Sequence, residues 1–373
     1  KKDQGFWPAT MYLEGLDQYR GWFQSSLLTA VGALGQGAPF KECVTHGWTV
    51  DGEGKAMHKS LGNGVDPADI FNENGADILR LWAASADYHA DVRCSKEIFK
   101  QLSQNYLKFR NTCKFMLDNL VDFDPENLVK PEEMPKLDRW LLTKLNELIE
   151  KAEQSYCDYE FHIITHAVND FCVNTLSSFY LDIVKDRLYC DGADSLSRRS
   201  AQTALYLTLH TLSKLFAPIL VFTCDEIWLA MPHTAADDAR NVVLNEMNKP
   251  FAAYALTESE MADWEKLVDV RTAVNGVLEA ARAEKKIGKS LEADVHLTVP
   301  AEDAFLANMD GKELADLLIV SQVEVTVGEG VKASAEEAAG TKCPRCWKHS
   351  TAANAEGLCP RCAEVMAKFP DLA

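Results

Sequence analysis

The sequence predicts a multidomain chain with an α/β fragment at the start, a bundle of long helices, a small α+β domain, and a cysteine-rich module at the end. Its 373 residues exceed what one hydrophobic core usually organises. Apolar residues suit short strands before residue 70, follow the helical period from about residue 95, and alternate again after residue 290. Two closely spaced cysteine pairs then set a last module apart.

Composition limits the class of protein. A hydrophobic content of 47% and a charged content of 25% are typical of a globular chain. No apolar run approaches the roughly 20 residues that span a membrane, and no signal peptide opens the sequence. The chain starts with Lys1 and Lys2, without an initiator methionine, in what reads as the middle of a domain. We therefore expect a fragment of a longer polypeptide.

The formal net charge of −18 argues against binding nucleic acid through a global basic field. Any RNA partner has to be met by local patches of lysine and arginine. For each patch taken alone, a solvated helix face is the favoured interpretation. The candidate patches are Lys96, Lys100, Lys108, Arg110 and Lys114; Arg198 and Arg199; Arg282, Lys285, Lys286 and Lys289; and Lys342, Arg345, Lys348 and Arg361.

Cysteine usage indicates a reducing compartment. Eleven cysteines are present, and seven of them stand singly within apolar helical patterns. Such thiols behave as small buried hydrophobic groups, whereas a disulfide framework is typical of short secreted chains. We therefore expect a cytoplasmic protein.

The stretch from Thr45 to Asn63 is the main candidate site in the first part of the chain. A short apolar alternation leads into a glycine-broken turn and then into a cluster containing Lys59 and Ser60. Glycines let backbone amides approach an anion, and lysines supply charge where phosphate oxygens become more negative. Taken by itself, such a loop is more often an ordinary solvated turn.

Upstream, strand, helix (Ser25–Val31), turn (Gly35–Pro39) and strand predict a piece of α/β architecture. Ligands of such sheets lie at the carboxyl ends of the strands. We expect a polar pocket there and an apolar one beside it; the alternative is that the aromatic residues are simply core. The expected pocket residues are Glu14, Asp17, Gln18 and Trp22.

The middle of the chain predicts a helical bundle. Residues 76–84 form one amphipathic pattern, and Ser95 caps a longer one with a regular apolar stripe. Thr223–Glu226 reads as a capping box that opens a short helix. Long helices joined by short polar links pack as a bundle. The stripe is Ile98, Leu102, Tyr106, Phe109, Cys113, Met116 and Leu120, and the other long helices are expected from Asp138, over Phe161–Val184 and over Ser197–Phe216.

The last third predicts a small α+β domain. A helix from Trp264 to Lys286 precedes two alternating segments, Val295–Val299 and Val323–Val327, which predict strands. The acidic, alanine-rich run Ser334–Gly340 then predicts a flexible tether to the last module.

Two Cys-x-x-Cys pairs predict one tetrahedral, structural zinc site, with about one zinc per chain. Each pair places its thiolates on one tight turn, and the spacer Trp347–Leu358 lets the turns face each other. Disulfides or a redox motif fit poorly with a duplicated motif in a reducing compartment. Four thiolates leave no open position for hydrolysis, so the metal shapes the module. The expected ligands are Cys343, Cys346, Cys359 and Cys362.

Cations surround the cysteine pairs, and they suggest contact with RNA phosphates. These are Lys342, Arg345, Lys348 and Arg361. Trp347 has two interpretations, stacking on a base or covering the core, and we favour the core.

The run Lys55–Asn63, preceded by Val50-Asp51-Gly52, resembles the KMSKS signature loop of class I aminoacyl-tRNA synthetases. The run Met11–Phe23 resembles the segment that precedes this loop in isoleucyl-tRNA synthetases. One position departs from the pattern, because Ala56 stands where the first lysine belongs. The resemblance therefore assigns the catalytic phosphate contact to Lys59, with Ser60 beside it and Lys55 as a substitute.

Resemblance to bacterial-type isoleucyl-tRNA synthetases continues along essentially the whole chain. It implies that the bundle binds the tRNA anticodon by stacking and hydrogen bonding unstacked bases. The segments that carry it are Asp138–Leu142, Tyr180–Tyr189, Asp225–Trp228 and Glu284–Ala293. The predicted domains are 1–65 (end of the Rossmann-like catalytic domain), 66–94 (connecting module), 95–235 (anticodon-binding domain), 236–333 (linker and small α+β domain) and 334–373 (zinc-binding module).

The resemblance also implies the reaction of the intact enzyme. Isoleucine and ATP, with Mg²⁺, form an adenylate, and the acyl group then passes to the 3′ end of isoleucine tRNA. Glu14 would contact the adenylate, and Trp22 would wall the isoleucine pocket. The HIGH motif and the editing domain are not found in these residues, so we expect the fragment to be inactive alone, and we expect a monomer.

Two alternatives stay open. A valyl or leucyl enzyme shares the loop and the bundle, although the cysteine module and Glu284–Ala293 count against it. A stand-alone, zinc-containing RNA-binding protein would leave Lys59 and Glu14 without a use. A His-x-Gly-His segment upstream in the parent reading frame would support the enzyme, and a nearby start codon would exclude it.

Overall fold

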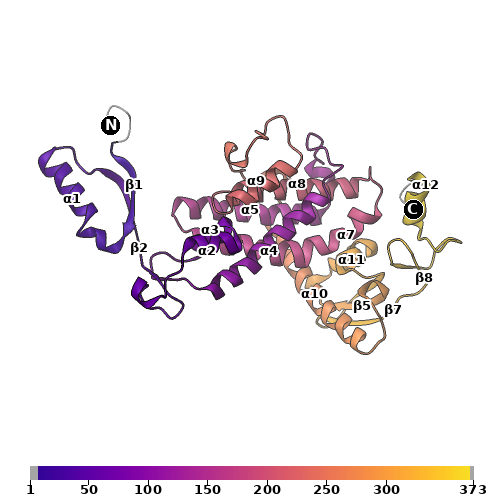
Figure 1. Cartoon of the computed structure of the whole chain (residues 1–373). Helices are drawn as coiled ribbons and strands as arrows, with labels where there is room; N and C mark the ends of the chain where they lie inside the picture. The colour runs from indigo at the N-terminus through magenta and orange to yellow at the C-terminus, as the bar shows by residue number, and fades with distance from the viewer. Residues whose placement is uncertain (1–6, 370–373) are drawn as a thin grey trace. The chain divides into compact units, whose positions relative to one another are not determined.

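The computed structural model describes residues 7–369 (Figure 1). By their internal contacts, these residues form two compact units. The first unit runs to Arg110 and includes Ala152–Asn169 and Phe216–Thr223. The second comprises Asn111–Lys151, Asp170–Leu215 and the chain from Cys224 onward. Within the described residues, no helix is both long and apolar enough to cross a membrane. The predicted multidomain fold class is confirmed.

The first unit begins with a small parallel sheet. Strands β1 (Ala9–Gly15) and β2 (Phe40–His46) pair in parallel, with Glu14 opposite Thr45. Helix α1 (Trp22–Leu28) connects them and continues as a π-helical turn to Ala33. The helix therefore starts three residues earlier than the sequence predicts. Both strands end at the same edge, where ligands of parallel sheets usually bind.

A second element of this unit supports the candidate loop. Strands β3 (Thr49–Val50) and β4 (Val92–Arg93) pair in parallel, and helices α2 (Pro67–Asn74) and α3 (Ala76–Ser85) lie between them in sequence. A Cβ on Gly47 would lie 2.4 Å from the carbonyl oxygen of Ala90, so only glycine allows the chain to pass here. The core of this element is Ile70, Ile78, Cys94 and Phe99.

The predicted helical bundle is present, and its apolar stripes are buried. In the helix expected from Asp138, Leu141, Leu145 and Ala152 are all less than 2% exposed. The third helix is longer than predicted and contains a π-helical segment, Phe171–Tyr180. The helices are α4 (Lys96–Asp118), α5 (Lys136–Cys157), α6 (Phe161–Asp170), α7 (Leu181–Cys190), α8 (Leu196–Phe216) and α9 (Val221–Ala230).

The predicted capping box at Thr223 is wrong, because α9 already begins at Val221. The helix N-terminus is capped instead by Asp77 of α3. Its carboxylate accepts the backbone N–H and the hydroxyl of Thr223 at 2.8 and 2.6 Å. Arg80, one turn further along α3, donates to the carbonyl oxygens of Pro218 and Ile219. A distant carboxylate thus satisfies the exposed amides that a local cap would otherwise bind.

The second unit contains a buried ion pair between α5 and α7. Arg187 donates to both carboxylate oxygens of Asp138, at 3.0 and 2.6 Å. The hydroxyl of Tyr180 donates to the same carboxylate at 2.6 Å, and Arg187 also binds the carbonyl of Ser197 at the start of α8. The Asp138 side chain is fully buried. This cluster fixes three helices at one point.

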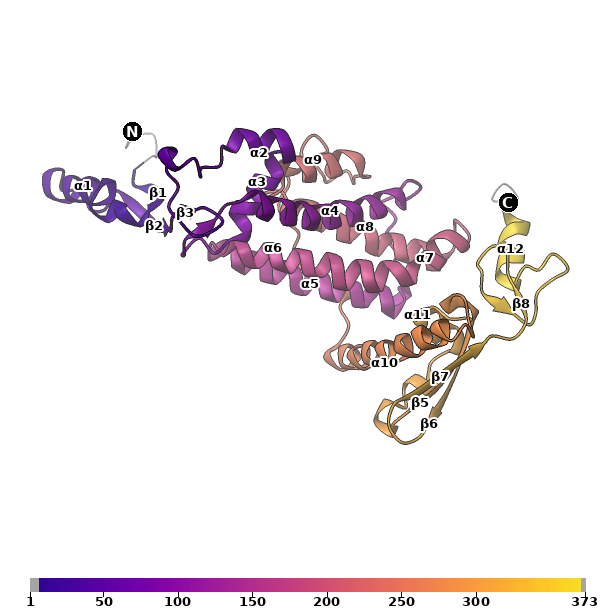
Figure 2. The ribbon, with the colours of Figure 1, turned by 60° about the horizontal axis from the view of Figure 1, so that its bottom comes forward.

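The α+β domain follows α10 (Glu258–Ala283), which is capped by Thr257 with Glu260. The two predicted strands are present as β5 (Ala293–Val299) and β6 (Gln322–Val327). They pair in parallel, and the connection between them contains α11 (Gly311–Leu318). Figure 2 shows α10 and α11 on the same side of this sheet. The buried residues of β5 are its alternate ones, Ala293, Val295, Leu297 and Val299.

The predicted flexible tether is wrong, because residues Lys332–Glu337 form strand β7, antiparallel to β5. Ala333 lies opposite Leu297, and Ala335 lies opposite Val295. The two alanines therefore lie on the helix-covered face, where small side chains fit, and their charged neighbours face outward. The alternation of alanine with polar residues in this run is the two-residue period of a strand.

The buried ion pair gives the first prediction. Replacing Asp138 with alanine leaves the Arg187 guanidinium buried without its carboxylate, and we expect a loss of about 3–5 kcal/mol in the free energy of unfolding. The control is Asp118→Ala, which removes an exposed pair with Lys114 in α4 and should cost no more than about 0.5 kcal/mol. Urea unfolding followed by helical circular dichroism measures both. Equal losses in the two variants would contradict the assignment.

Candidate functional site

The candidate loop follows β3 and closes with a short 3₁₀ turn, Lys59–Leu61. Gly62 ends this turn with a φ of 62°, in the left-handed region that residues with a Cβ rarely adopt. Met57 packs against the buried cluster that contains Ile70 and Ile78, so the middle of the loop is anchored. Both ends and the middle are therefore fixed, while the lysines on either side are exposed.

Two residues that sequence reasoning missed hold this loop together. Asn63 Nδ2 donates to Asp51 Oδ2 at 2.8 Å and to the carbonyl of Ala56 at 3.1 Å. Its Oδ1 accepts the N–H of His58 at 2.9 Å. The hydrogen bond from Asn63 is the main cause that lowers the pKa of Asp51 below its ordinary value. Both residues stand inside the candidate stretch, but sequence alone does not show which amide a loop asparagine binds.

The two lysines of the loop differ in availability. Lys55 Nζ lies 2.6 Å from Glu53 Oε2, although both side chains are largely exposed. Within the part of the chain that the structure describes, Lys59 makes no ion pair, and its neighbour Ser60 is also exposed. Lys59 is therefore the more accessible cation, which agrees with the preference drawn from the sequence.

The predicted polar residues lie where β1 ends. Glu14 is the penultimate residue of β1, and Asp17 and Gln18 follow in the 3₁₀ turn Leu16–Tyr19. Gln18 Oε1 accepts the N–H of Trp22 at 2.9 Å, so this side chain caps α1. Glu14 and Asp17 are exposed. The structure thus brings these residues to one strand end.

Trp22 is not a core residue. Its side chain is 56% exposed and stacks on the ring of Tyr12, with 6.0 Å between ring centroids. Phe23, the next residue, is the buried one, at 8%. Of the two sequence interpretations, an exposed apolar wall therefore fits Trp22, and a core role fits Phe23.

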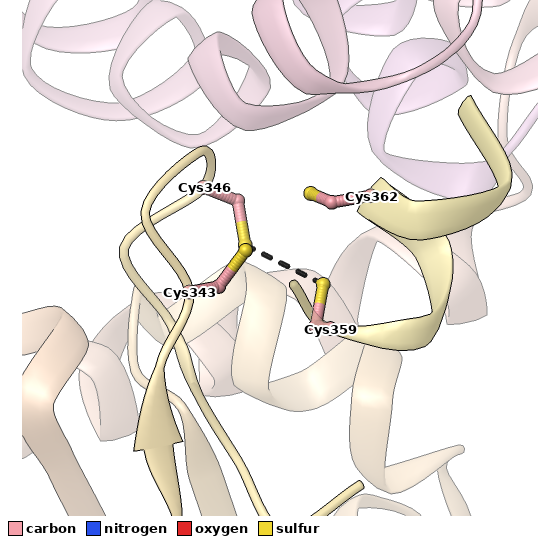
Figure 3. Close-up of side chains that lie close together, drawn as sticks. All are labelled: Cys343, Cys346, Cys359 and Cys362. Atoms are coloured by element: carbon pink, nitrogen blue, oxygen red, sulfur yellow. Dashed lines mark hydrogen bonds between the residues drawn. The ribbon is translucent and has the colours of Figure 1, made fainter. Parts of the chain in front are cut away.

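The four terminal cysteines gather into one cluster (Figure 3). Their sulfur atoms lie within 4.8 Å of one another, and those of Cys346 and Cys359 are 3.7 Å apart. Tetrahedral zinc with Zn–S bonds of about 2.3 Å requires about 3.8 Å between sulfurs. Cys343 and Cys346 come from the loop between β8 (Thr341–Lys342) and β9 (His349–Ser350), and the other two from the start of α12 (Pro360–Lys368). The residues present fit a structural zinc ion.

The electrostatics of this cluster favour a metal cation. A hydrogen bond from the Cys362 thiol lowers the pKa of Cys346 to about 4, and the charge of Arg361 contributes. The same hydrogen bond, with burial, raises the pKa of Cys362. One thiolate therefore forms easily, and its negative charge opposes ionisation of the other thiols. A divalent cation removes that opposition by replacing the remaining protons.

Trp347 contradicts the sequence interpretation, because it is 52% exposed and does not cover the core. Its φ of 66° is left-handed, and its N–H bonds the carbonyl of Cys343 at 2.9 Å. The tight turn that joins Cys343 and Cys346 requires this conformation, which directs the indole outward. Lys289 Nζ lies 4.8 Å from the ring centroid.

The cations around the cysteines are engaged within the chain. Arg361 binds acidic residues of α7 and the loop after it, and Arg345 binds backbone carbonyls at the end of α7. Lys348 pairs with Asp316, and Lys342 Nζ lies 2.6 Å from Glu292. These four residues serve structural contacts, so the structure does not support a free phosphate-binding patch here.

Three family models match the chain in order. Residues 1–95 match the class I tRNA synthetases for isoleucine, leucine, methionine and valine. Residues 138–297 match the anticodon-binding domain of tRNA ligases, and residues 340–365 match a zinc finger found in FPG and IleRS. The isoleucine–tRNA ligase of Moorella thermoacetica is 45% identical over 96% of this chain, and that of Caldicellulosiruptor saccharolyticus is 47% identical over 96%. The chain is a homologue of class I isoleucine–tRNA ligases.

This homology confirms the resemblance and the structural zinc expected from the cysteine pairs. The chain spans 40% of the length of these two relatives. Solved structures agree on the fold. The LeuRS of Agrobacterium radiobacter matches with a TM-score of 0.51 and 16% identity, covering 79% of this chain and 31% of that one. The methionyl-tRNA synthetase of Mycobacterium tuberculosis matches with a TM-score of 0.51 and 19% identity, covering 65% and 47%.

The zinc centre gives the second prediction. Metal analysis of the purified chain should find about one zinc per chain, because four thiolates complete one tetrahedral site. Cys359→Ser removes one ligand and should release the metal and expose residues 341–369 to proteolysis. The control is Cys157→Ser, an exposed cysteine outside the cluster, which should keep its zinc. A zinc-free chain whose last module stays resistant would overturn the assignment.

Proposed function

We propose that this chain is the part of an isoleucine–tRNA ligase that carries the signature loop, the tRNA-binding bundle and the structural zinc module. The observation that carries the proposal is 45% identity to isoleucine–tRNA ligases along 96% of the chain. The intact enzyme forms isoleucyl-adenylate from isoleucine and ATP, with Mg²⁺ and with release of pyrophosphate. It then transfers the isoleucyl group to the 3′ end of isoleucine tRNA and releases AMP. The domain boundaries predicted from sequence, a monomer and a cytoplasmic location belong to the same proposal.

In this proposal, Lys59 acts on the phosphates during activation. Its accessibility and its place in a loop anchored by Met57 and Asn63 support the role, because a fixed backbone limits the reorganisation needed during reaction. Lys55 is already paired with Glu53, yet an exposed pair is weak enough to exchange partners. Lys55 therefore serves as a secondary phosphate contact, and Ser60 lies next to the main one.

The strand end of β1 supplies the amino-acid side of the site. Glu14 is exposed and accepts a hydrogen bond from the adenylate, and Trp22 presents an apolar surface to the isoleucine side chain. The indole of Trp22 is 56% exposed. Contact with a branched aliphatic side chain is favourable, because it removes apolar area of both the indole and the ligand from water. Gln18, which caps α1, positions Trp22, and Asp17 completes the polar edge.

The bundle binds the anticodon region of isoleucine tRNA in this proposal. The match of residues 138–297 to an anticodon-binding domain supports it. Several cations of the predicted basic patches are held by acids of the chain; Arg198, for example, binds both oxygens of Asp122. Recognition would then depend on stacking and base-edge hydrogen bonds more than on a basic surface.

The third prediction tests Lys59 in the intact enzyme. Lys59→Ala should lower isoleucine-dependent pyrophosphate exchange by orders of magnitude while changing the isoleucine dissociation constant little, because the lysine acts mainly on the transition state. Lys55→Ala should cost less. Lys41→Ala, an exposed lysine of β2, is the matched control and should change neither quantity. An unchanged exchange rate in Lys59→Ala would reject the role.

The fourth prediction tests RNA recognition by the chain itself. The 373-residue chain should bind isoleucine tRNA more tightly than a non-cognate tRNA, with affinity that falls as salt rises. Filter binding or fluorescence anisotropy over a salt series measures both properties. Equal affinity for the two tRNAs would show that the chain lacks anticodon specificity.

A further inference from the structure

The first cysteine turn caps the end of helix α7. Arg345 lies between two of the clustered cysteines, and its guanidinium donates to the carbonyl oxygens of Cys190 and Tyr189, the latter at 3.4 Å. Carbonyls at the end of a helix lack partners within the helix, and a cation there also meets the negative end of the helix dipole. The metal-binding turn therefore supplies partners for the last two carbonyls of α7, beyond the backbone cap that Asp191 gives to the carbonyl of Arg187.

The second cysteine turn binds side chains near the same end of α7. Arg361 stands between Cys359 and Cys362 on α12, and its guanidinium donates to both oxygens of Asp186, at 2.5 and 2.8 Å. It also donates to Asp191, just after the helix, at 3.1 Å. One planar group thus joins the last turn of α7 to the loop that leads into α8.

This contact is better protected from water than an ordinary surface pair. The side chains of Arg361, Asp186 and Asp191 are 21%, 21% and 12% exposed. Burial alone opposes ionisation of Asp186, but the hydrogen bonds and charge of Arg361 outweigh it and hold the pKa of Asp186 below its ordinary value. Bidentate, charge-assisted bonds of this kind are the strong ones.

The corner between α7 and α8 also has a pair that serves as an internal comparison. Lys368 of α12 lies 2.5 Å from Asp194, and their side chains are 60% and 59% exposed. Exposed pairs of this kind contribute little, because water and salt screen them. The Arg361 contact is therefore the stronger of these two ionic links between α12 and the corner.

We propose that the zinc site locks the α7–α8 corner, residues 186–196, through Arg345 and Arg361. Zinc fixes the two cysteine turns, the turns fix the two arginines, and the arginines fix the end of α7. The corner lies inside the region that matches an anticodon-binding domain. Arg361 is a positioning residue for tRNA binding, and this last step rests on the proposed function.

The lock and a direct phosphate contact predict opposite effects of one substitution. Asp186→Asn removes a negative charge, and less negative charge near a phosphate strengthens binding to RNA. In the lock, the same substitution removes the main partner of Arg361 and weakens binding, because the corner loses its fixed geometry. The sign of the change therefore distinguishes positioning from contact.

The fifth prediction tests the lock by hydrogen exchange on the full zinc-loaded chain. The reporters are the amides of Asp191 and Ser195, which bond the carbonyls of Arg187 and Gly192 at 3.2 and 3.0 Å. Arg361→Gln should speed their exchange about tenfold or more, since charge-assisted hydrogen bonds are lost. All variants should keep about one zinc per chain.

Further variants complete the exchange experiment. Asp186→Asn should have the same effect as Arg361→Gln, the double variant should add little, and Arg361→Lys should fall between. Lys368→Gln, the exposed control, should change exchange less than about twofold. Removing zinc from the unmodified chain with a chelator should also free the corner. Unchanged protection in both the Arg361→Gln chain and the zinc-free chain overturns the lock.

Binding of isoleucine tRNA by the same variants completes the test. Arg361→Gln and Asp186→Asn should each weaken binding several-fold. If Asp186→Asn strengthens binding while Arg361→Gln weakens it, Arg361 contacts phosphate and the positioning role is wrong. If the unmodified chain binds no tRNA but exchange responds as expected, the lock stands and the proposed function fails. If tRNA binds and exchange does not respond, the lock fails alone.

Discussion

Helix α7 is held through two adjacent residues, Asp186 and Arg187, that bind different partners. Consecutive residues of an α-helix are about 100° apart around the axis, so Arg187 turns into the bundle and Asp186 turns toward the zinc module. Inside, Arg187 meets the fully buried Asp138, and the desolvation of both charges is offset because the Tyr180 hydroxyl also donates to that carboxylate. Outside, Asp186 meets Arg361. The bundle and the cysteine module therefore share one helix.

Regular periodicity was predictable from the sequence, and long-range partners were not. The stripe from Ile98 to Leu120 predicts α4, and the two Cys-x-x-Cys pairs predict the cysteine cluster, because each signal lies within a few turns of chain. The cap of α9 comes from Asp77, 146 residues away from Thr223, and no local pattern indicates it. The sequence does not indicate strand β7, because its apolar side chains are alanines, which carry little hydrophobic signal. Residue type favours the core for Trp347, whereas the left-handed turn directs it outward.

The excess of acidic over basic residues in this chain means that many of its cations are paired with carboxylates in the fold. With a net charge of −18, many lysines and arginines find a carboxylate within the fold, and Lys342, Lys348 and Arg361 near the cysteines are examples. A sequence scan that counts cations locally overstates how many remain free to meet phosphate. In the proposed function, a tRNA-binding region built in this way gains little from steering by long-range attraction. Affinity must then come from shape and from contacts made after the surfaces meet, which makes rigidity of the bundle and its corner more important than its charge.

The signature loop follows the same logic on a smaller scale. The side chains of Asp51 and Asn63 form hydrogen bonds with backbone groups of the loop and with each other. Met57 packs against the core beneath the loop. The side chains of Lys55 and Lys59 remain exposed, on a loop whose backbone is held in place by these contacts. The departure from the family pattern, Ala56 in place of a lysine, falls at a position whose carbonyl is already bound by Asn63. Lys55, one position earlier, is an exposed cation on the same turn. Because the N–H of Lys55 is fixed by Asp51 at 2.8 Å, its side chain starts from a defined backbone position. In the proposed function, this side chain leaves Glu53 for a phosphate.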